Sequence, residues 1–229
     1  MKKVVLSLGG SLIIPDEIRV GFLKEFRELI LSRLDEYQFV IFTGGGRTAR
    51  TYMNGLEEIV GEEATSDSKD WLGIYSSWVN ARLVYEMFQG HVSDKIIVDP
   101  TEALENDAPI TIGGGWKPGW STDYDAVEVA WRNGYERVVN LSNIEYVYDK
   151  DPAQFDDAQP IKQITWPEFR KIVGDKWTPG LNMPFDPIAS KLAEEHKLEV
   201  LVANGANIEN IKAILDGQPF VGTRIIPGV

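Results

Sequence analysis

Residues 4–12 read VVLSLGGSL, a continuous apolar run that ends in two glycines and leads into a segment able to start a helix. The same order returns in FTGGGRTAR (42–50) and ITIGGGWKPGWSTD (110–123). Apolar runs without alternation are typical of strands that are covered on both faces in a parallel sheet. Further runs of this kind are KIIVD (95–99), RVVNL (137–141) and LEVLVAN (198–204).

Helical patterns lie between these runs. Residues 16–37 place apolar side chains at helical spacing, which predicts a helix with one face on a core. Three more helices are predicted from their end signals: the capping-box pair Thr165 and Glu168, the cap Asp186 before Pro187, and the cap Asn207 with the stop Gly217. Strands that alternate with helices predict one α/β domain over residues 1–229, a three-layer αβα sandwich with a mainly parallel central sheet.

Residues 70–88 form a helical pattern that is apolar on more than one side. Trp71, Ile74, Trp78 and Tyr85 share one stripe, and a second stripe holds Leu72, Val79, Leu83 and Met87. We expect such a helix to be buried in the core or against another subunit.

Composition limits the possible functions. Thirty-five acidic and 23 basic residues give a net charge of -12, which disfavours a general nucleic-acid binder because phosphate contacts need basic surfaces. The chain has no cysteine and two histidines, so disulfides, thiol nucleophiles and clustered cysteine or histidine metal sites are excluded. No apolar run approaches the length of a membrane-spanning helix, so we expect a soluble, intracellular protein without a membrane partner.

The three glycine loops suit anion binding. Glycine lets the main chain approach an anion closely, and a helix N-terminus presents unpaired N–H groups. In a parallel sheet the loops would share the carboxyl edge, which predicts a site for more than one phosphate. The alternative is that the glycines only make tight turns. The P-loop pattern is absent, and GGGRTA (44–49) matches the dinucleotide fingerprint only weakly.

Seven segments in this order resemble the amino-acid kinase superfamily, and most closely its archaeal-type uridylate (UMP) kinases. They are VVLSLGGSL, FTGGGRTAR, DWLGI, GGGWKPGWSTD, SNIEYVYDKDP, FDPIASKLA and GTRI. The resemblance implies a nucleoside monophosphate kinase of pyrimidine biosynthesis, which transfers a phosphoryl group from ATP, with Mg²⁺, to UMP and yields UDP. It also implies a cytoplasmic homo-oligomer, a dimer or hexamer, whose other partners are small-molecule nucleotides.

The resemblance also assigns roles to residues. It implies an acceptor-binding lobe over residues 1–135 and an ATP-binding lobe over residues 136–229, with no residue assigned as a metal ligand. Arg50 would bind the UMP phosphate, Asp70 the ribose hydroxyls, and Thr122 the acceptor phosphate. The other acceptor residues would be Gly44, Gly45, Gly46, Gly73, Gly114, Gly115 and Ser121. Gly9, Gly10, Ser11, Asn143, Tyr148 and Asp151 would bind ATP, with Asp186 and Lys191 as catalytic residues.

Two departures from the family pattern leave alternatives open. Ser7 stands where many members have a lysine that holds ATP phosphate, and Glu145-Tyr146 replaces an Asp-Gly pair. One alternative is a related kinase with another acceptor, and another is a nucleotide-binding regulator or storage protein without turnover. Singly, Asp186 could be only a helix cap, Lys191 only a solvated lysine, and Thr122 only a cap for the next helix.

Overall fold

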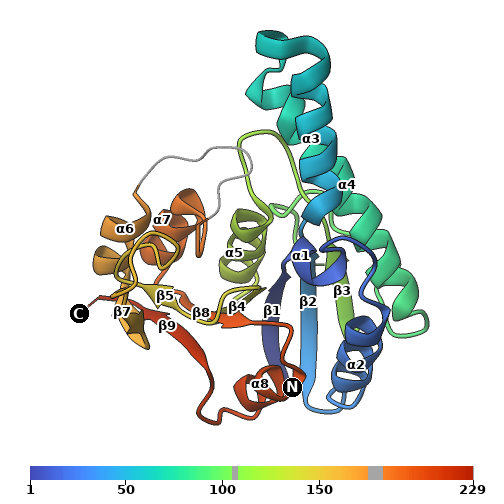
Figure 1. The fold of residues 1–229 in the computed structure, drawn as a ribbon. Helices are drawn as coiled ribbons and strands as arrows, with labels where there is room; N and C mark the ends of the chain where they lie inside the picture. Colours follow the sequence, from blue (N-terminus) through green and yellow to red (C-terminus); the bar gives the residue numbers. More distant parts are fainter. Residues whose placement is uncertain (105–107, 175–182, 229) are drawn as a thin grey trace.

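The computed structural model describes residues 1–104, 108–174 and 183–228, which form a three-layer αβα sandwich (Figure 1). Its central sheet has seven strands in the order β3-β2-β1-β4-β8-β9-β7. The bounds of these strands are β1 Lys2–Leu8, β2 Tyr37–Thr43, β3 Ile110–Gly113, β4 Arg137–Ser142, β7 Gln163–Thr165, β8 Glu199–Asn204 and β9 Gly222–Ile226. Strands β5 (Val147–Tyr148) and β6 (Pro160–Ile161) make a separate two-stranded sheet. The predicted fold class is therefore confirmed.

Five neighbouring strands of the central sheet, β3, β2, β1, β4 and β8, are parallel. The direction changes at β9, which is antiparallel to β8 and parallel to the edge strand β7. The carboxyl ends of the five parallel strands lie at one edge of the sheet, and the glycine loops follow β1, β2 and β3 there. The expected lobe boundary near residue 135 lies just before β4, and the sheet continues across it.

Helices cover both faces of the sheet. Their bounds are α1 Gly10–Ile13, α2 Val20–Leu31, α3 Gly46–Val60, α4 Ser66–Met87, α5 Thr122–Arg132, α6 Trp166–Val173, α7 Pro187–Glu195 and α8 Ile208–Leu215, with a 3-10 turn, η1, at Gly61–Glu63. Alternate residues of β1 enter different cores: Val4 and Leu6 pack with residues of α2 and α8, whereas Val5 packs with residues of α5, α6 and α7. This burial on both faces is the reason for the unbroken apolar runs.

Predictions that rest on local chemistry are confirmed at the helix ends. Thr165 and Glu168 form the capping box of α6, Asp186 caps α7 with Pro187 following it, and Asn207 caps α8. The predicted helix over residues 16–37 is shorter, since α2 begins at Val20. The predicted strand at 95–99 is wrong: only Ile97 pairs with β3, as an isolated bridge, so this segment lies along β3 without forming a ladder.

Helices α3 and α4 pack against each other and extend beyond the end of the sheet (Figure 1). Within α4 the side that faces the protein is made of Ile74 and Val84 together with the small residues Ser77 and Ala81. In the first predicted stripe Ile74 is buried, whereas Trp71 and Trp78 are exposed in this chain. These two tryptophans do not pack in the core, and their burial against another subunit stays a prediction. No helix in the described part of the chain is long and apolar enough to cross a membrane.

Candidate functional site

The first two glycine loops touch each other at the carboxyl edge of the sheet. A Cβ atom on Gly10 would lie 2.5 Å from the carbonyl oxygen of Gly44 and closer still to the amide nitrogen of Gly46. The Asn80 side chain of α4 donates a hydrogen bond of 2.7 Å to the Gly44 carbonyl and fixes the second loop from the other side. Glycine is therefore required here by close packing, and the loops form one continuous surface.

A cavity of about 180 Å³ lies beside this surface, between α3, α4 and the start of α5. It gathers eight of the residues assigned to the acceptor: Gly45, Gly46, Arg50, Asp70, Gly73, Gly115, Ser121 and Thr122. Two others, Gly44 and Gly114, are not in its lining but adjoin residues that are. Sequence reasoning missed the apolar part of the lining, which is Ala49, Met53 and Ile74, together with Ser77. Residues at helical spacing of this kind usually pack in a core. They line the cavity because α3 and α4 pack against each other at this point.

This cavity, here called the acceptor cavity, is lined by a positively charged side chain and by the N-terminus of a helix. Arg50 is exposed on α3 and has no ion-pair partner within 4.0 Å among the residues that the structure describes. The N-terminus of α5 opens at the same place, because Ser121 and Thr122 line the cavity. The cap of α5 is Ser121, whose Oγ accepts a hydrogen bond of 3.1 Å from the Tyr124 amide, so Thr122 is not needed as a cap. A free guanidinium beside a helix N-terminus favours an anion.

The loop over residues 115–121, here called the tryptophan loop, closes one side of the cavity. Its chain is anchored at Gly115, whose N–H donates to the Ser77 hydroxyl at 2.7 Å and whose carbonyl accepts from the Trp78 indole at 2.6 Å. The Trp116 amide donates to the buried Asp125 carboxylate at 3.1 Å. Trp120 lines the cavity and packs against Tyr124, with ring centroids 4.1 Å apart. The tryptophan loop is therefore held at both its start and its aromatic end.

Asp70 already has a partner in the tryptophan loop. The Gly119 amide donates to its Oδ2 at 2.7 Å, and Gly119 has a φ of +87°, a conformation that favours glycine. Burial raises the pKa of the Asp70 carboxyl, and the Gly119 hydrogen bond acts in the opposite direction. The second oxygen of Asp70 can accept a hydrogen bond from a hydroxyl while the first holds the loop.

Next to Ser7 of β1 and Asn140 of β4 lies Asp123, a partly buried carboxylate at the start of α5. Its Oδ1 accepts hydrogen bonds of 2.7 Å from the Ser7 hydroxyl and from the Asn140 side chain. Burial raises the pKa of Asp123 to about 6, and repulsion from Asp186 acts in the same direction. The neutral Ser7 hydroxyl thus donates a hydrogen bond to the Asp123 carboxyl. It does so at the position where many members of the family have a lysine.

The residues assigned to ATP are less closely gathered. Gly9, Gly10 and Ser11 form the turn into α1, but Asn143 is exposed after β4 and Tyr148 lies in β5. Asp151 accepts from the Ala153 amide and from the Gln154 side chain, so its carboxylate fixes its own turn. Asn143, Tyr148 and Asp151 do not line the acceptor cavity.

Asp186 stands just before the first residue of α7, and Lys191 lies in the middle of the same helix. Asp186 caps α7 by accepting from the Ile188 and Ala189 amides at 2.5 and 2.8 Å, while its buried Oδ2 has no hydrogen-bond partner among the residues that the structure describes. Burial raises the pKa of Asp186. The Lys191 side chain is 60% exposed, and its Nζ lies 4.0 Å from the Glu195 carboxylate. The structure therefore directs Lys191 toward Glu195, and it shows no hydrogen bond between Lys191 and the described glycine loops.

Comparison with known proteins agrees with this architecture. The model of the amino acid kinase family matches residues 2–204. A uridylate kinase from Methanobrevibacter smithii is 31% identical over 98% of this chain and 99% of its own length, and one from Methanococcus aeolicus is 32% identical over 98% and 100%. The crystal structure of uridylate kinase from Archaeoglobus fulgidus has a TM-score of 0.82 at 30% identity, covering 98% of this chain and 100% of its own.

Proposed function

The chain belongs to the amino acid kinase family, and on that premise we propose that it transfers the γ-phosphoryl group of ATP to UMP and releases UDP and ADP. Its relatives that bear the name uridylate kinase match over nearly their whole length, which supports the same reaction class here. The reaction belongs to pyrimidine nucleotide synthesis, and we place it in the cytoplasm.

The acceptor cavity is the observation that carries this proposal. It combines the unpaired Arg50 guanidinium, the N-terminus of α5 and the Asp70 carboxylate within one space. Arg50 and the helix N-terminus would bind the phosphate of UMP, and the free oxygen of Asp70 would accept from the ribose. The aromatic and apolar wall made by Trp120 and Met53 would cover the base.

The chemistry asks mainly for alignment. An oxygen of the UMP phosphate, already ionised near neutral pH, forms a bond to the γ-phosphorus of ATP as the bond to the β-phosphate oxygen breaks. No proton has to be removed, so no general base is needed. Contact between the Gly9-Gly10 turn and the Gly44–Gly46 loop would hold donor and acceptor phosphates next to each other.

Charge on the donor side would come from two sources. The Lys191 ammonium lies 4.0 Å from the Glu195 carboxylate, which is a weak, exposed ion pair. Lys191 would therefore leave Glu195 and turn toward the phosphates. The buried Oδ2 of Asp186 has no hydrogen-bond partner in the described part of the chain and is a carboxylate oxygen of the kind that Mg²⁺ prefers. Mg²⁺ held there would neutralise ATP phosphate charge. The described residues contain no group of three acidic or histidine ligands, so phosphate oxygens would supply most of the coordination.

The test is a phosphoryl-transfer assay with Mg·ATP and a panel of nucleoside monophosphates and other phosphorylated acceptors. We expect UDP from UMP, a lower kcat for Lys191→Ala, and a higher KM for UMP in Asp70→Asn. Lys24→Ala, an exposed lysine on α2, is the matched control and should retain full activity. Turnover of a different acceptor would contradict the proposed substrate.

A nucleotide-binding protein without turnover is the second candidate. It is favoured by the neutral side chain of Ser7, which donates to Asp123 and supplies no charge to ATP phosphate. It is also favoured by Lys191, which is exposed and lies beside Glu195. Tight binding of ATP and UMP in calorimetry, with no UDP formed by the same sample, would establish this reading and reject the kinase.

We also propose that the protein forms a homo-oligomer through one face of α3 and α4. Its exposed apolar side chains are Tyr52, Ile59, Trp71, Tyr75 and Val79. Contiguous apolar surface of this kind marks association sites. Val79→Glu should lower the mass measured by light scattering to that of a smaller species, whereas Val221→Glu, at an exposed valine ahead of β9, should leave it unchanged. A monomeric wild-type protein would contradict this proposal.

A further inference from the structure

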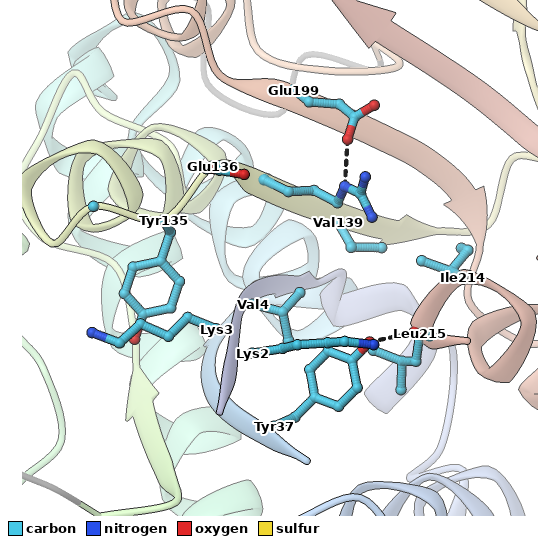
Figure 2. A pocket seen from close by; sticks show the side chains of 12 residues that line it. Lys2, Lys3, Val4, Tyr37, Tyr135, Glu136, Val139, Glu199, Ile214 and Leu215 are labelled. Carbon is cyan, nitrogen blue, oxygen red and sulfur yellow. Dashed lines mark hydrogen bonds and ion pairs between the residues drawn. The ribbon is translucent and has the colours of Figure 1, made fainter. Parts of the chain in front are cut away.

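A second cavity lies at the opposite edge of the sheet from the glycine loops. Its volume is about 430 Å³, and Lys2, Tyr37, Arg137 and Glu199 are the first residues of the four neighbouring strands β1, β2, β4 and β8 that line it (Figure 2). Strand β1 has seven residues, so this strand-start cavity is roughly 20 Å from the Gly9-Gly10 turn at the usual rise per residue. It is therefore separate from the acceptor cavity.

The floor of the strand-start cavity is apolar. Val4, Val139, Ile214 and Leu215 line it and are all buried. The Tyr37 ring completes this apolar surface, and its hydroxyl donates to the Leu215 carbonyl, which fixes the ring (Figure 2). Tyr135 lines the cavity from the other face of the sheet, where it packs with residues of α5, α6 and α7. Burial raises the pKa of the Tyr135 phenol to about 12, so this ring stays neutral.

Positive charge surrounds that floor. The Lys2 ammonium lies 5.2 Å from the centroid of the Tyr37 ring, and the Lys3 ammonium lies 5.5 Å from that of Tyr135. Neither lysine has an ion-pair partner among residues 1–104, 108–174 and 183–228. Both therefore keep their charge available to a ligand, next to rings that already hold the ammonium groups in place.

The acidic groups of this cavity do not cancel the positive charge. Glu199 pairs with two guanidinium groups, those of Arg137 and Arg224, so this cluster keeps one positive charge. Among the lining residues, Lys2, Lys3 and Arg137 carry three positive charges, and Glu136 and Glu199 carry two negative ones. An excess of one positive charge stands out on a chain whose net charge is -12.

We propose that the strand-start cavity binds a small organic anion that carries a planar apolar ring, such as an aryl phosphate or an aryl carboxylate. The ring lies on the apolar floor beside Tyr37, and the anionic group meets Lys2, whereas Lys3 points to the other face of the sheet (Figure 2). A bare inorganic anion does not suit this space, because it would fill little of the volume and leave the apolar floor in water. The site neither uses nor requires the proposed kinase reaction.

Phenyl phosphate is the probe, and the readout is carbon-13 NMR of protein labelled at its tyrosine rings, with Tyr37→Phe and Tyr135→Phe to assign the signals. We expect the Tyr37 signal to shift and saturate in the wild type, and the Tyr135 signal to change little. Lys2→Ala/Lys3→Ala should weaken binding by about fivefold, because the ammonium group that meets the anion is lost from a half-open site. Lys24→Ala/Lys95→Ala, which removes two exposed lysines elsewhere, should bind as the wild type does.

Inorganic phosphate and benzyl alcohol test the two halves of the ligand separately, and each should bind more weakly than phenyl phosphate. Four results would overturn the proposal: no saturable shift of the Tyr37 signal, equal affinity for inorganic phosphate, equal affinity for benzyl alcohol, or unchanged affinity in the double lysine variant. Circular dichroism of that variant establishes that it is folded, since both side chains are exposed and do not take part in the core.

Discussion

Replacing Asp123 by asparagine should stabilise the protein at neutral pH. Asp123 is partly buried, and the loss of hydration raises the pKa of its carboxyl from 3.8 to about 6. Below pH 3.8 the acid is protonated in both the folded and the unfolded state, so it adds no cost. As the pH rises from 3.8 to 6, the unfolded chain releases its proton and the folded chain keeps it, so the free energy of unfolding falls.

The size of the effect follows from the two-unit shift. At 1.36 kcal/mol for each pKa unit, ionised Asp123 costs about 3 kcal/mol of stability above pH 6. Asparagine has the same shape, stays neutral, and can still accept from Ser7 and Asn140. We expect Asp123→Asn to raise the free energy of unfolding by about 2 to 3 kcal/mol at pH 7.5, and by well under half of that gain at pH 4.

Urea unfolding at these two pH values measures the difference. Asp94→Asn, at an exposed aspartate after β-bridge residue Val92, serves as the control and should change stability little at either pH. A gain from Asp123→Asn that is equal at both pH values would refute the reasoning, because it would arise from packing and not from the buried charge. A loss of stability at pH 7.5 would refute it too.

Three further predictions concern the acceptor cavity. Arg50→Gln should raise the KM for UMP by roughly ten- to a hundredfold with little change in urea unfolding, because its guanidinium has no partner within the described protein and so contributes to binding only. Ser121→Ala removes the cap of α5 and should cost about 1 kcal/mol in urea unfolding, whereas Ser121→Thr should retain most of the stability. Gly10→Ala should destabilise by about 3 kcal/mol or more, since its Cβ would overlap the Gly44–Gly46 backbone, while Gly21→Ala, where the new atom meets open space, should cause no loss.

Sequence reasoning was accurate where neighbouring residues settle the structure. The capping box at Thr165 and the Asp186-Pro187 start need only a few consecutive residues, and both are confirmed. The unbroken apolar run of β1 likewise reflects burial on both faces, and it led directly to the parallel sheet.

Features that depend on distant partners were not predictable. Ile97 belongs to an apolar run that predicts a strand, but it pairs with β3 through one isolated bridge. Whether such a run forms a ladder depends on its position beside β3, which the run itself does not indicate. Nothing near Asp70 indicates that it accepts from Gly119, 49 residues away. Ser7 and Asp123 are hydrogen-bonded although they are 116 residues apart in the sequence. The direction of the Lys191 side chain depends on its rotamer, which places Nζ near Glu195.

The four anchors of the tryptophan loop, at Ser77, Trp78, Asp125 and Asp70, have a consequence for affinity. Folding has already removed the conformational freedom of this segment before any nucleotide arrives. An incoming ligand therefore meets a preorganised wall and loses no binding energy in ordering it. Loosening one anchor, far from any ligand atom, would transfer that entropic cost to the binding step.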